Sequence, residues 1–189
     1  MLPDFLTASP AITLARSLLG RVLASHVGGE RVSGLITETE AYLGVDDPAS
    51  HAWQGRRRKG YLGVWSPPGS WYVYRSYGIH WCLDLTAGPE GVGGAVLLRA
   101  VEPLEGIDVI RRRRGAVRDR DLCNGPGKLG QAFGVTGEHD GLAATDDCII
   151  RLEGTVQNAD ARRTLATPRI GISRAVDWPL RFVLLPPGQ

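Results

Sequence analysis

Apolar residues along the chain fall into two kinds of pattern, and the first of these predicts strands. Several short runs either alternate apolar with polar residues or are continuously apolar, and turn residues bound them. The runs cover residues 21–26, 31–42, 71–77, 80–86, 94–101, 148–152, 170–173 and 180–185. Two tight turns are predicted between consecutive runs, at Gly28-Gly29 and at Tyr77-Gly78. Such closely spaced strands favour antiparallel pairing.

The second pattern repeats apolar residues at helical spacing and predicts helices between the strands. Ser9-Pro10 suits the start of one helix, with Ile12, Ala15, Leu18 and Leu19 on its inward face. Another runs from Pro103 to Arg114 with Leu104, Ile107 and Ile110 inward, and a third runs from about Asn124 to Gly134. The sequence therefore predicts an α+β fold: a single mixed domain over residues 1–189 with a curved, mainly antiparallel sheet, flanking helices and a protruding β-hairpin.

Composition fits a globular protein of one domain. The chain has 189 residues, of which 43% are hydrophobic and 22% charged, and its formal net charge is +2. No run is apolar enough for a membrane helix, and the N-terminus lacks the pattern of a signal peptide. Cys82, Cys123 and Cys148 form neither a disulfide framework nor a zinc motif. We expect a cytoplasmic protein, nucleoid-associated if prokaryotic, without a metal and without a membrane partner.

Charge and aromatic residues are concentrated in one segment. Residues 53–81 hold eight of the ten Trp and Tyr residues, and residues 51–83 contain no Asp or Glu. The same segment carries the cations Arg56, Arg57, Arg58, Lys59 and Arg75. Because aromatic rings stack on bases and cations pair with phosphates, this composition suggests a nucleic-acid surface. A core strand followed by a solvated basic loop would have the same composition.

The strand before this segment carries the candidate chemistry. Side chains on a strand alternate between faces, so Glu38 and Glu40 point the same way. Together they could polarise a water and stabilise a cationic transition state, although either could be structural. At the predicted hairpin tip, Tyr77 suits an interface and could fill the gap left by an extruded nucleotide.

Five sequence blocks, taken in order, resemble one known family. The blocks are ETEAYLG with DPASHA, GSWYVYRSYGIHWCLDL, VLLRAVEPLEG, LCNGPGKLGQA, and RIGI with W-PLRF, and they span residues 14–182. This combination resembles the alkyladenine (3-methyladenine) DNA glycosylase family. The resemblance implies a mixed α/β domain without cofactor that reaches duplex DNA through the minor groove. It also implies excision of alkylated, and in some cases deaminated, purines, which initiates base excision repair.

The resemblance further implies a role for individual residues. Glu40 matches the general base that activates the water attacking C1′, and Arg99 and the backbone carbonyl of Ile170 match groups that hold that water. Tyr42, Tyr74 and His51 match the base pocket, and Tyr77 matches the intercalating residue. No lysine lies near the motif, so we expect a monofunctional glycosylase without lyase activity. A monomer is our default expectation. Lys59 and Lys128 then join Arg56, Arg57, Arg58 and Arg75 as phosphate contacts, Glu38 is interpreted as structural, and Arg111 to Arg114 as a solvated helix face.

The sequence departs from the family pattern at Asp84, where Asn is usual. An ionised carboxylate accepts hydrogen bonds but cannot donate them. We therefore hypothesise that Asp84 changes base preference, toward 3-methylguanine or toward cationic bases in general.

Two other functions fit part of the sequence. A lesion or minor-groove binding protein would use the basic aromatic hairpin, but it would not need Glu40 and Arg99 to order a water. A carbohydrate hydrolase could use Glu38 and Glu40, but acids two apart on a strand do not flank a scissile bond. The hydrolase would also have no use for the cationic loop.

Overall fold

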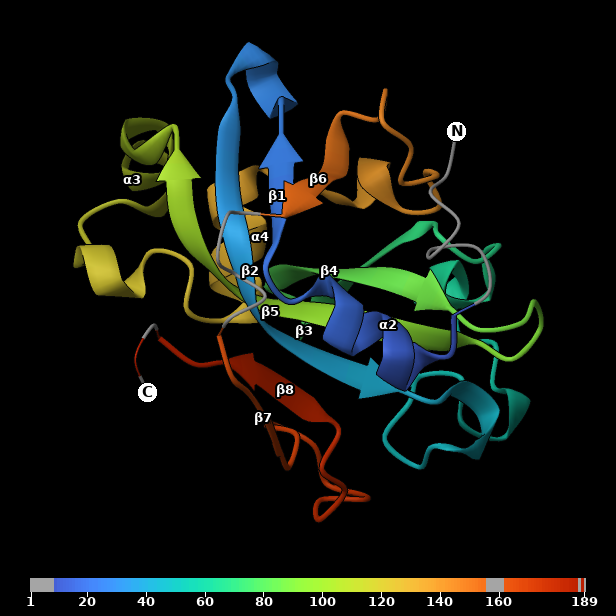
Figure 1. The fold of residues 1–189 in the computed structure, drawn as a ribbon. Coiled ribbons are helices and arrows are strands. Elements are labelled where there is room, and N and C mark those ends of the chain that lie inside the picture. Colours follow the sequence, from blue (N-terminus) through green and yellow to red (C-terminus); the bar gives the residue numbers. More distant parts are fainter. Residues whose placement is uncertain (1–8, 156–161, 187, 189) are drawn as a thin grey trace.

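The computed structural model describes residues 9–155, 162–186 and 188, and its strands form one sheet (Figure 1). Along the sheet the order is β3-β4-β5-β2-β1-β6, and β8 joins β2 while pairing with β7 on its other side. All pairings among the described strands are antiparallel. The strands are β1 (Arg21–Ser25), β2 (Val32–Tyr42), β3 (Trp71–Ser76), β4 (His80–Ala87), β5 (Gly94–Glu105), β6 (Ile150–Thr155), β7 (Thr164–Thr167) and β8 (Arg181–Leu184).

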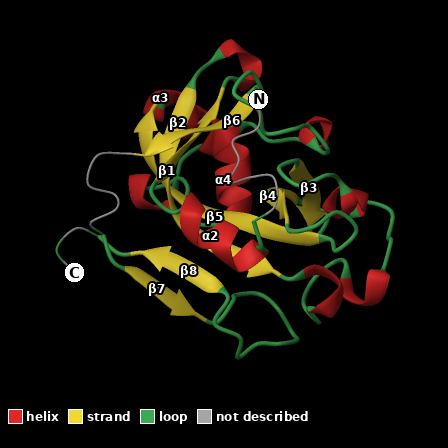
Figure 2. Cartoon of the chain, turned by 45° about the vertical axis from the view of Figure 1, so that its right-hand side comes forward, coloured by secondary structure: helices red, strands yellow, loops and turns green. Residues whose placement is uncertain are grey.

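Strand β2 is the centre of this sheet because it changes partner along its length. Residues 32–35 pair with β1, whereas residues 38–40 pair with β8, and β5 follows β2 along the other edge. The β2–β5 register shifts around Glu38, as expected of a β-bulge, which bends the strand where its partners change. The β7–β8 ribbon consequently lies at the opposite end of the molecule from β6 (Figures 1 and 2). Glu38 and Glu40 lie in the half of β2 that faces β8.

Three helices complete the described fold: α2 (Ala11–Leu18), α3 (Ile107–Arg114) and α4 (Pro126–Phe133). Helix α2 packs on β2 and β5, α4 packs on β4 and β5, and α3 packs on α4. Buried side chains from these elements, such as Leu14, Leu98 and Phe133, form one hydrophobic core. The predicted mixed α+β architecture with a mainly antiparallel sheet is confirmed. No helix among the described residues is long and apolar enough to cross a membrane.

Some predicted details are wrong. Strand β5 continues through Pro103 to Glu105, and α3 begins only at Ile107, after Gly106 adopts a left-handed conformation with φ of 68°. Leu104 and Ile107 are therefore exposed, and of the three predicted inward residues only Ile110 is buried.

Three further predictions fail for local reasons. Helix α2 turns Ala11 and Leu14 inward and leaves Ile12 exposed. The β1–β2 connection is a longer 3-10 turn that includes Gly28 and Gly29, both with positive φ, and not a two-residue turn. Residues 170–173 are not a strand, and the Ile170 backbone N–H donates to the Glu40 side chain.

The connection between β2 and β3 forms one wall of the main pocket. It contains three 3-10 turns, Gly44–Asp46, Trp53–Gly55 and Leu62–Trp65, joined by loops (Figure 2). Gly44 has φ of 80° and lies so close to the Val92 carbonyl that any side chain there would overlap it. This close approach ties the connection to the turn between β4 and β5.

Candidate active site

A pocket of about 500 Å³ lies between the sheet and the 48–64 segment, and aromatic side chains form its walls. Strand alternation places Trp71 and Val73 in the core, so Tyr72 and Tyr74 face the other way, toward the pocket. The aromatic lining consists of Tyr42, His51, Tyr61, Tyr72, Tyr74 and Tyr77. The structure therefore brings together the predicted pocket residues Tyr42, His51, Tyr74 and Asp84 in one cavity.

His51 is held in this wall by two tyrosines. Its ring stacks on Tyr61 with 4.1 Å between centroids, and its Nδ1 lies 2.8 Å from the Tyr72 hydroxyl oxygen. Burial and the positive charge of Arg58 lower the pKa of His51 to about 4. The imidazole is consequently neutral near pH 7, so it can donate from one nitrogen and accept at the other.

Glu40 lies next to this pocket with its side chain fully buried (0% exposed). Its Oε1 accepts a hydrogen bond of 2.8 Å from the Ile170 backbone N–H and lies 3.3 Å from Arg99 Nη1. Its Oε2 accepts a 2.9 Å hydrogen bond from the Tyr42 hydroxyl. Burial raises the pKa of Glu40, while Arg99 and the two hydrogen bonds oppose that rise. The two hydrogen bonds and the ion pair with Arg99 hold the carboxylate in a fixed orientation, and the raised pKa makes it a stronger base than an exposed glutamate.

Glu38 supports Arg99 from the same strand. Arg99 Nε donates to Glu38 Oε1 at 2.7 Å, and Arg181 Nε donates to the same oxygen at 2.6 Å. Burial acts to raise the pKa of Glu38, but the hydrogen bonds from Arg181 and Arg99 outweigh it and leave that pKa lowered. Glu38 is thus a permanently charged partner that orients Arg99 toward Glu40, which agrees with its interpretation as a structural residue.

A second buried ion pair lies behind Tyr42 and was not predicted. Arg169 and Asp47, both with fully buried side chains, form two contacts of 2.5 and 2.9 Å. The Arg169 guanidinium also lies 4.5 Å from the centroid of the Tyr42 ring and donates to the Ala41 carbonyl at 2.9 Å. Arg169 immediately precedes Ile170, so the pair fixes the backbone that donates to Glu40. The two residues are 122 positions apart, and no local signal in the sequence joins them.

Asp84 lies in β4 opposite Tyr72 of β3 and also lines the pocket. It is 3% exposed, and its Oδ1 has no hydrogen-bond partner. Burial, with a smaller contribution from the charge of Glu40, raises the pKa of Asp84 well above its ordinary value. Burial therefore disfavours the ionised carboxylate that the hypothesis on base preference assumes, and the hypothesis itself stays a prediction.

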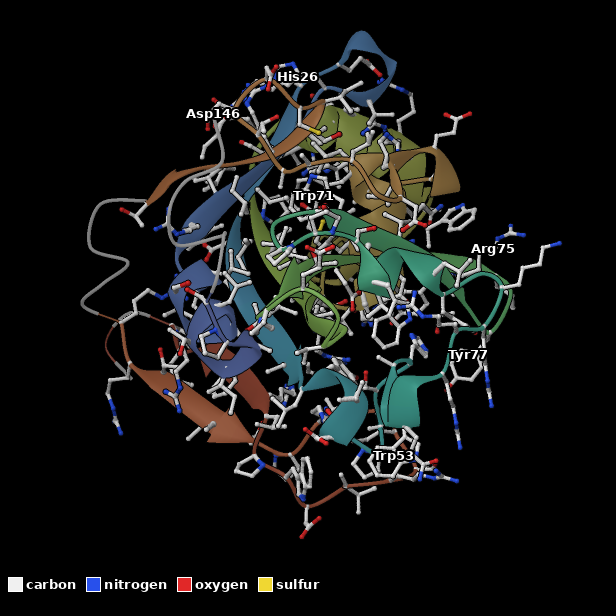
Figure 3. All side chains as sticks on the ribbon, turned by 90° about the vertical axis from the view of Figure 1, so that its right-hand side faces the viewer. His26, Trp53, Trp71, Arg75, Tyr77 and Asp146 are labelled. Atoms are coloured by element: carbon white, nitrogen blue, oxygen red, sulfur yellow. The ribbon has the colours of Figure 1, made fainter. Side chains whose placement is uncertain are left out.

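The β3–β4 hairpin ends in exposed side chains. Tyr77 is 86% exposed and adopts a left-handed conformation with φ of 50°, and Ile79 beside it is also exposed. Figure 3 shows Tyr77 and Arg75 at one edge of the molecule, with Trp71 in its interior. An exposed tyrosine in a strained tip conformation suits a contact with another molecule.

The basic residues predicted to contact phosphate differ in their surroundings. Arg57 and Arg75 stack over Trp65 and Trp81, at 4.3 and 5.0 Å from the ring centroids. Arg58 and Lys59 are exposed, and Arg56 lines the pocket together with Arg174, which the sequence analysis missed. Lys128 differs, because its Nζ lies 2.7 Å from Asn124 Oδ1 and 3.7 Å from Asp121 Oδ1.

The run Arg111 to Arg114 binds the protein itself. Arg111 pairs with Asp108 and Asp119, Arg112 pairs with Glu30, and Arg113 donates to the carbonyl oxygens of Val27 and Ala132. Arg114 donates to the Leu122 carbonyl and to Gln131. The run is therefore less of a free solvated face than predicted, since each arginine joins α3 to a neighbouring segment.

Comparison with known protein families shows to which family this chain belongs. A family model described as methylpurine-DNA glycosylase (MPG) matches residues 4–186. Members of such a family are DNA glycosylases, which hydrolyse N-glycosyl bonds, and a buried carboxylate beside an aromatic pocket suits that class.

Relatives agree with the family model. Proteins from Nitrosospira multiformis and Granulibacter bethesdensis, both provisionally named 3-methyladenine DNA glycosylase, are 44% and 45% identical over 96% and 95% of this chain. The alignments cover 89% and 82% of those proteins. The DNA-3-methyladenine glycosylase of Mus musculus is 40% identical over 95% of this chain and 57% of its own length. The chain belongs to the methylpurine-DNA glycosylase family, which confirms the family predicted from the sequence blocks.

Proposed function

We propose that the chain is a monofunctional DNA glycosylase that flips alkylated purines out of duplex DNA and hydrolyses their N-glycosidic bond. The observation that carries this proposal is Glu40, a fully buried carboxylate held by two hydrogen bonds and an ion pair next to an aromatic pocket. A pocket of about 500 Å³ is large enough for a purine, and a base reaches it only when it has left the helix stack.

In the proposed reaction Glu40 removes a proton from a water. The water oxygen forms a bond to C1′ of the deoxyribose, the bond between C1′ and the purine nitrogen breaks, and the bonding electrons leave with the base. Arg99, and the Ile170 carbonyl as the resemblance implies, would hold the water. Arg99 also keeps Glu40 ionised, since it lies 3.3 Å from the Glu40 carboxylate and Glu38 fixes its other side.

The side chains that line the pocket are suited to bind both cationic alkylated purines and neutral deaminated purines. Stacking with Tyr42 and Tyr74 favours cationic alkylated bases, because the face of an aromatic ring attracts positive charge. Neutral deaminated bases such as hypoxanthine would rely on hydrogen bonds, for which the neutral His51 offers its Nε2, because its Nδ1 already bonds to the Tyr72 hydroxyl.

The exposed hairpin supports the proposed contact with DNA. Tyr77 would enter from the minor groove and fill the space that the flipped nucleotide leaves, and Ile79 beside it adds apolar surface. Arg56, Arg57, Arg58, Lys59 and Arg75 would contact phosphates, and Lys128 would use an N–H that its hydrogen bond to Asn124 leaves available. We further propose that the whole of residues 1–189 is the catalytic domain, acting as a monomer at the nucleoid of a cytoplasm that keeps its three cysteines reduced.

The test is release of free base from alkylated duplex DNA and from a hypoxanthine duplex, by the native protein and by Glu40→Gln. We expect the variant to lose about 10²- to 10⁴-fold in rate, the usual contribution of a general base. Glu90→Gln, in the exposed turn between β4 and β5, is the matched control and should keep the native rate. Abasic sites should be cleaved only after alkali.

Other outcomes would contradict the proposal in distinct ways. Tight lesion binding without base release by the native protein would indicate a damage sensor. Full activity of Glu40→Gln would exclude Glu40 as the base, and strand cleavage without alkali would indicate a lyase.

A further inference from the structure

Asp84 combines features that the proposed reaction does not use. Its side chain is more than nine-tenths buried, its Oδ1 has no hydrogen-bond partner, and it faces the pocket. A buried polar atom without a partner is costly and is rarely retained without a purpose. Among the described residues, Asp84 also forms no ion pair.

The two acids of this site differ sharply in their surroundings. Glu40 has the Ile170 N–H, the Tyr42 hydroxyl and Arg99, whereas Asp84 has none of them. Two carboxylates sharing one poorly hydrated region cannot both ionise easily, so the negative charge resides where the donors are. These contacts therefore favour ionisation of Glu40 over ionisation of Asp84.

The titratable and charged groups around Asp84 come from every strand that packs near it. They are Glu40 and Tyr42 on β2, Tyr72 and Tyr74 on β3, Cys82 on β4, Arg99 on β5, and Arg56 and Arg174 in the pocket lining. Burial raises the pKa of the three tyrosines and of Cys82 above their ordinary values, so they stay neutral near pH 7. Arg99 already forms ion pairs with Glu38 and Glu40. Asp84 is thus the side chain of this group that changes charge most readily when a cation arrives.

We propose that Asp84 reads the charge of the flipped base: it is protonated in the free protein and releases its proton to solvent when a cationic purine enters the pocket. The base and the carboxylate then form a buried ion pair, and the pocket gains no net charge. When a neutral purine enters, Asp84 keeps its proton. The neutral carboxyl group then offers the purine a hydroxyl donor beside a carbonyl acceptor. This inference rests on the proposed function, and it makes Asp84 a specificity-determining residue.

The sign of the pH dependence follows from proton release. At pH values below the pKa of Asp84 in the complex, the acid stays protonated and adds nothing to the preference for cationic bases. As the pH rises toward the pKa in the free protein, affinity for a cationic base increases by up to about tenfold per pH unit, while affinity for a neutral base does not.

The experiment compares two bases of the same shape that differ by one charge. Duplexes carry either 7-methyladenine, which is cationic, or uncharged 7-methyl-7-deazaadenine, each on a 2′-fluoro sugar that resists hydrolysis. Dissociation constants are measured by fluorescence anisotropy at several pH values for the native protein and for Asp84→Asn. We expect the native protein to favour the cationic base by roughly 10- to 100-fold more than the variant does, because a charge-assisted hydrogen bond exceeds a neutral one by that factor.

A second measurement needs no variant. Binding is followed by calorimetry in two buffers of different ionisation enthalpy, which reports the protons released. The native protein should release about one proton with the cationic base and none with its uncharged analogue. Equal proton release with both bases, or an unchanged cationic preference in a folded Asp84→Asn, would overturn the inference.

Failure of this inference is distinguishable from failure of the proposed function. If the native protein releases no base from any natural substrate, the glycosylase proposal fails, whereas the charge-reading test uses binding alone. If base is released normally but charge discrimination does not depend on pH, only the role of Asp84 is refuted.

Discussion

The buried pair of Arg169 and Asp47 offers the sharpest test of how the site is held together. We expect Arg169→Met to destabilise the fold and also to slow base excision. The substitution keeps most of the aliphatic volume but removes the guanidinium that contacts Asp47, the Ala41 carbonyl and the Tyr42 ring. Asp47 would then remain as a buried carboxylate without its cation.

The size of the effect follows from the contacts. Removing one partner of a buried ion pair costs about 3–5 kcal/mol, because an uncompensated charge remains. The backbone N–H groups of Leu43 and Ala49 still donate to Asp47 at 3.0 Å, which favours the lower value, about 3 kcal/mol. Since domains are stable by about 5–15 kcal/mol, this is a large fraction of the total. With a urea m-value of about 1–3 kcal/mol/M, the midpoint should fall by roughly 1–3 M.

Urea unfolding followed by tryptophan fluorescence measures the loss, and Arg174→Met is the matched control for stability. Arg174 is an exposed arginine of the same segment, so its substitution should change stability by less than about 0.5 kcal/mol. The double variant Asp47→Asn with Arg169→Met should lose less than the sum of the single losses, because the orphaned charge is gone. If the midpoint of Arg169→Met matches that of Arg174→Met, the pair does not stabilise the site as inferred.

Three further predictions concern the tip of the β3–β4 hairpin, the proposed general base Glu40, and helix α4. Tyr77→Ala should leave the melting temperature unchanged because Tyr77 is exposed, yet weaken binding to damaged duplex about tenfold or more, as measured by anisotropy. Burial raises the pKa of Glu40, and protonated Glu40 cannot accept a proton. The single-turnover rate of base excision should therefore decline as the pH falls through that raised pKa. A rate that stays constant at acidic pH would contradict this. Gly130→Ala should destabilise α4 in a thermal melt despite alanine's better helix propensity, because its Cβ would approach the Trp81 carbonyl closer than 3.0 Å.

Strand alternation allowed much of the fold to be predicted from the sequence. The β3–β4 hairpin, the long strand β2 and the split of β3 into a core face and a pocket face all follow from a period of two. The errors occur where tertiary contacts override a local signal. Pro103 suits a helix start, but pairing with Gly34 of β2 extends β5 past it. The apolar residues 170–173 resemble a strand, but Arg169 and Ile170 anchor that segment to Asp47 and Glu40 instead.

The site was predictable only as far as its residues lie together in the sequence. Glu40 and Tyr42 are two apart on one strand, and their hydrogen bond follows from that spacing once the strand is recognised. Tyr61 was not distinguished from the other aromatic residues of its segment, and the Arg169–Asp47 pair was missed because its two residues are 122 positions apart. Ile170 was expected to act through its carbonyl, while the structure shows its N–H donating to Glu40, a contact that residue identity cannot reveal.

The roles of Glu40 and Asp84 show why sequence alone could not complete the assignment. Both are acids on strands of one sheet, β2 and β4, which β5 separates, and their intrinsic pKa values differ little. Their difference arises from the donors, and each donor arrives by a separate route: Arg99 on β5, Tyr42 two residues along β2, and Ile170 from a loop 130 positions away. All three act on Glu40 and favour its ionised form, whereas burial favours the protonated form of Asp84. The proposed division of the site into a general base and a neutral acid thus depends on the assembled sheet, because no single stretch of the sequence carries all three partners of Glu40.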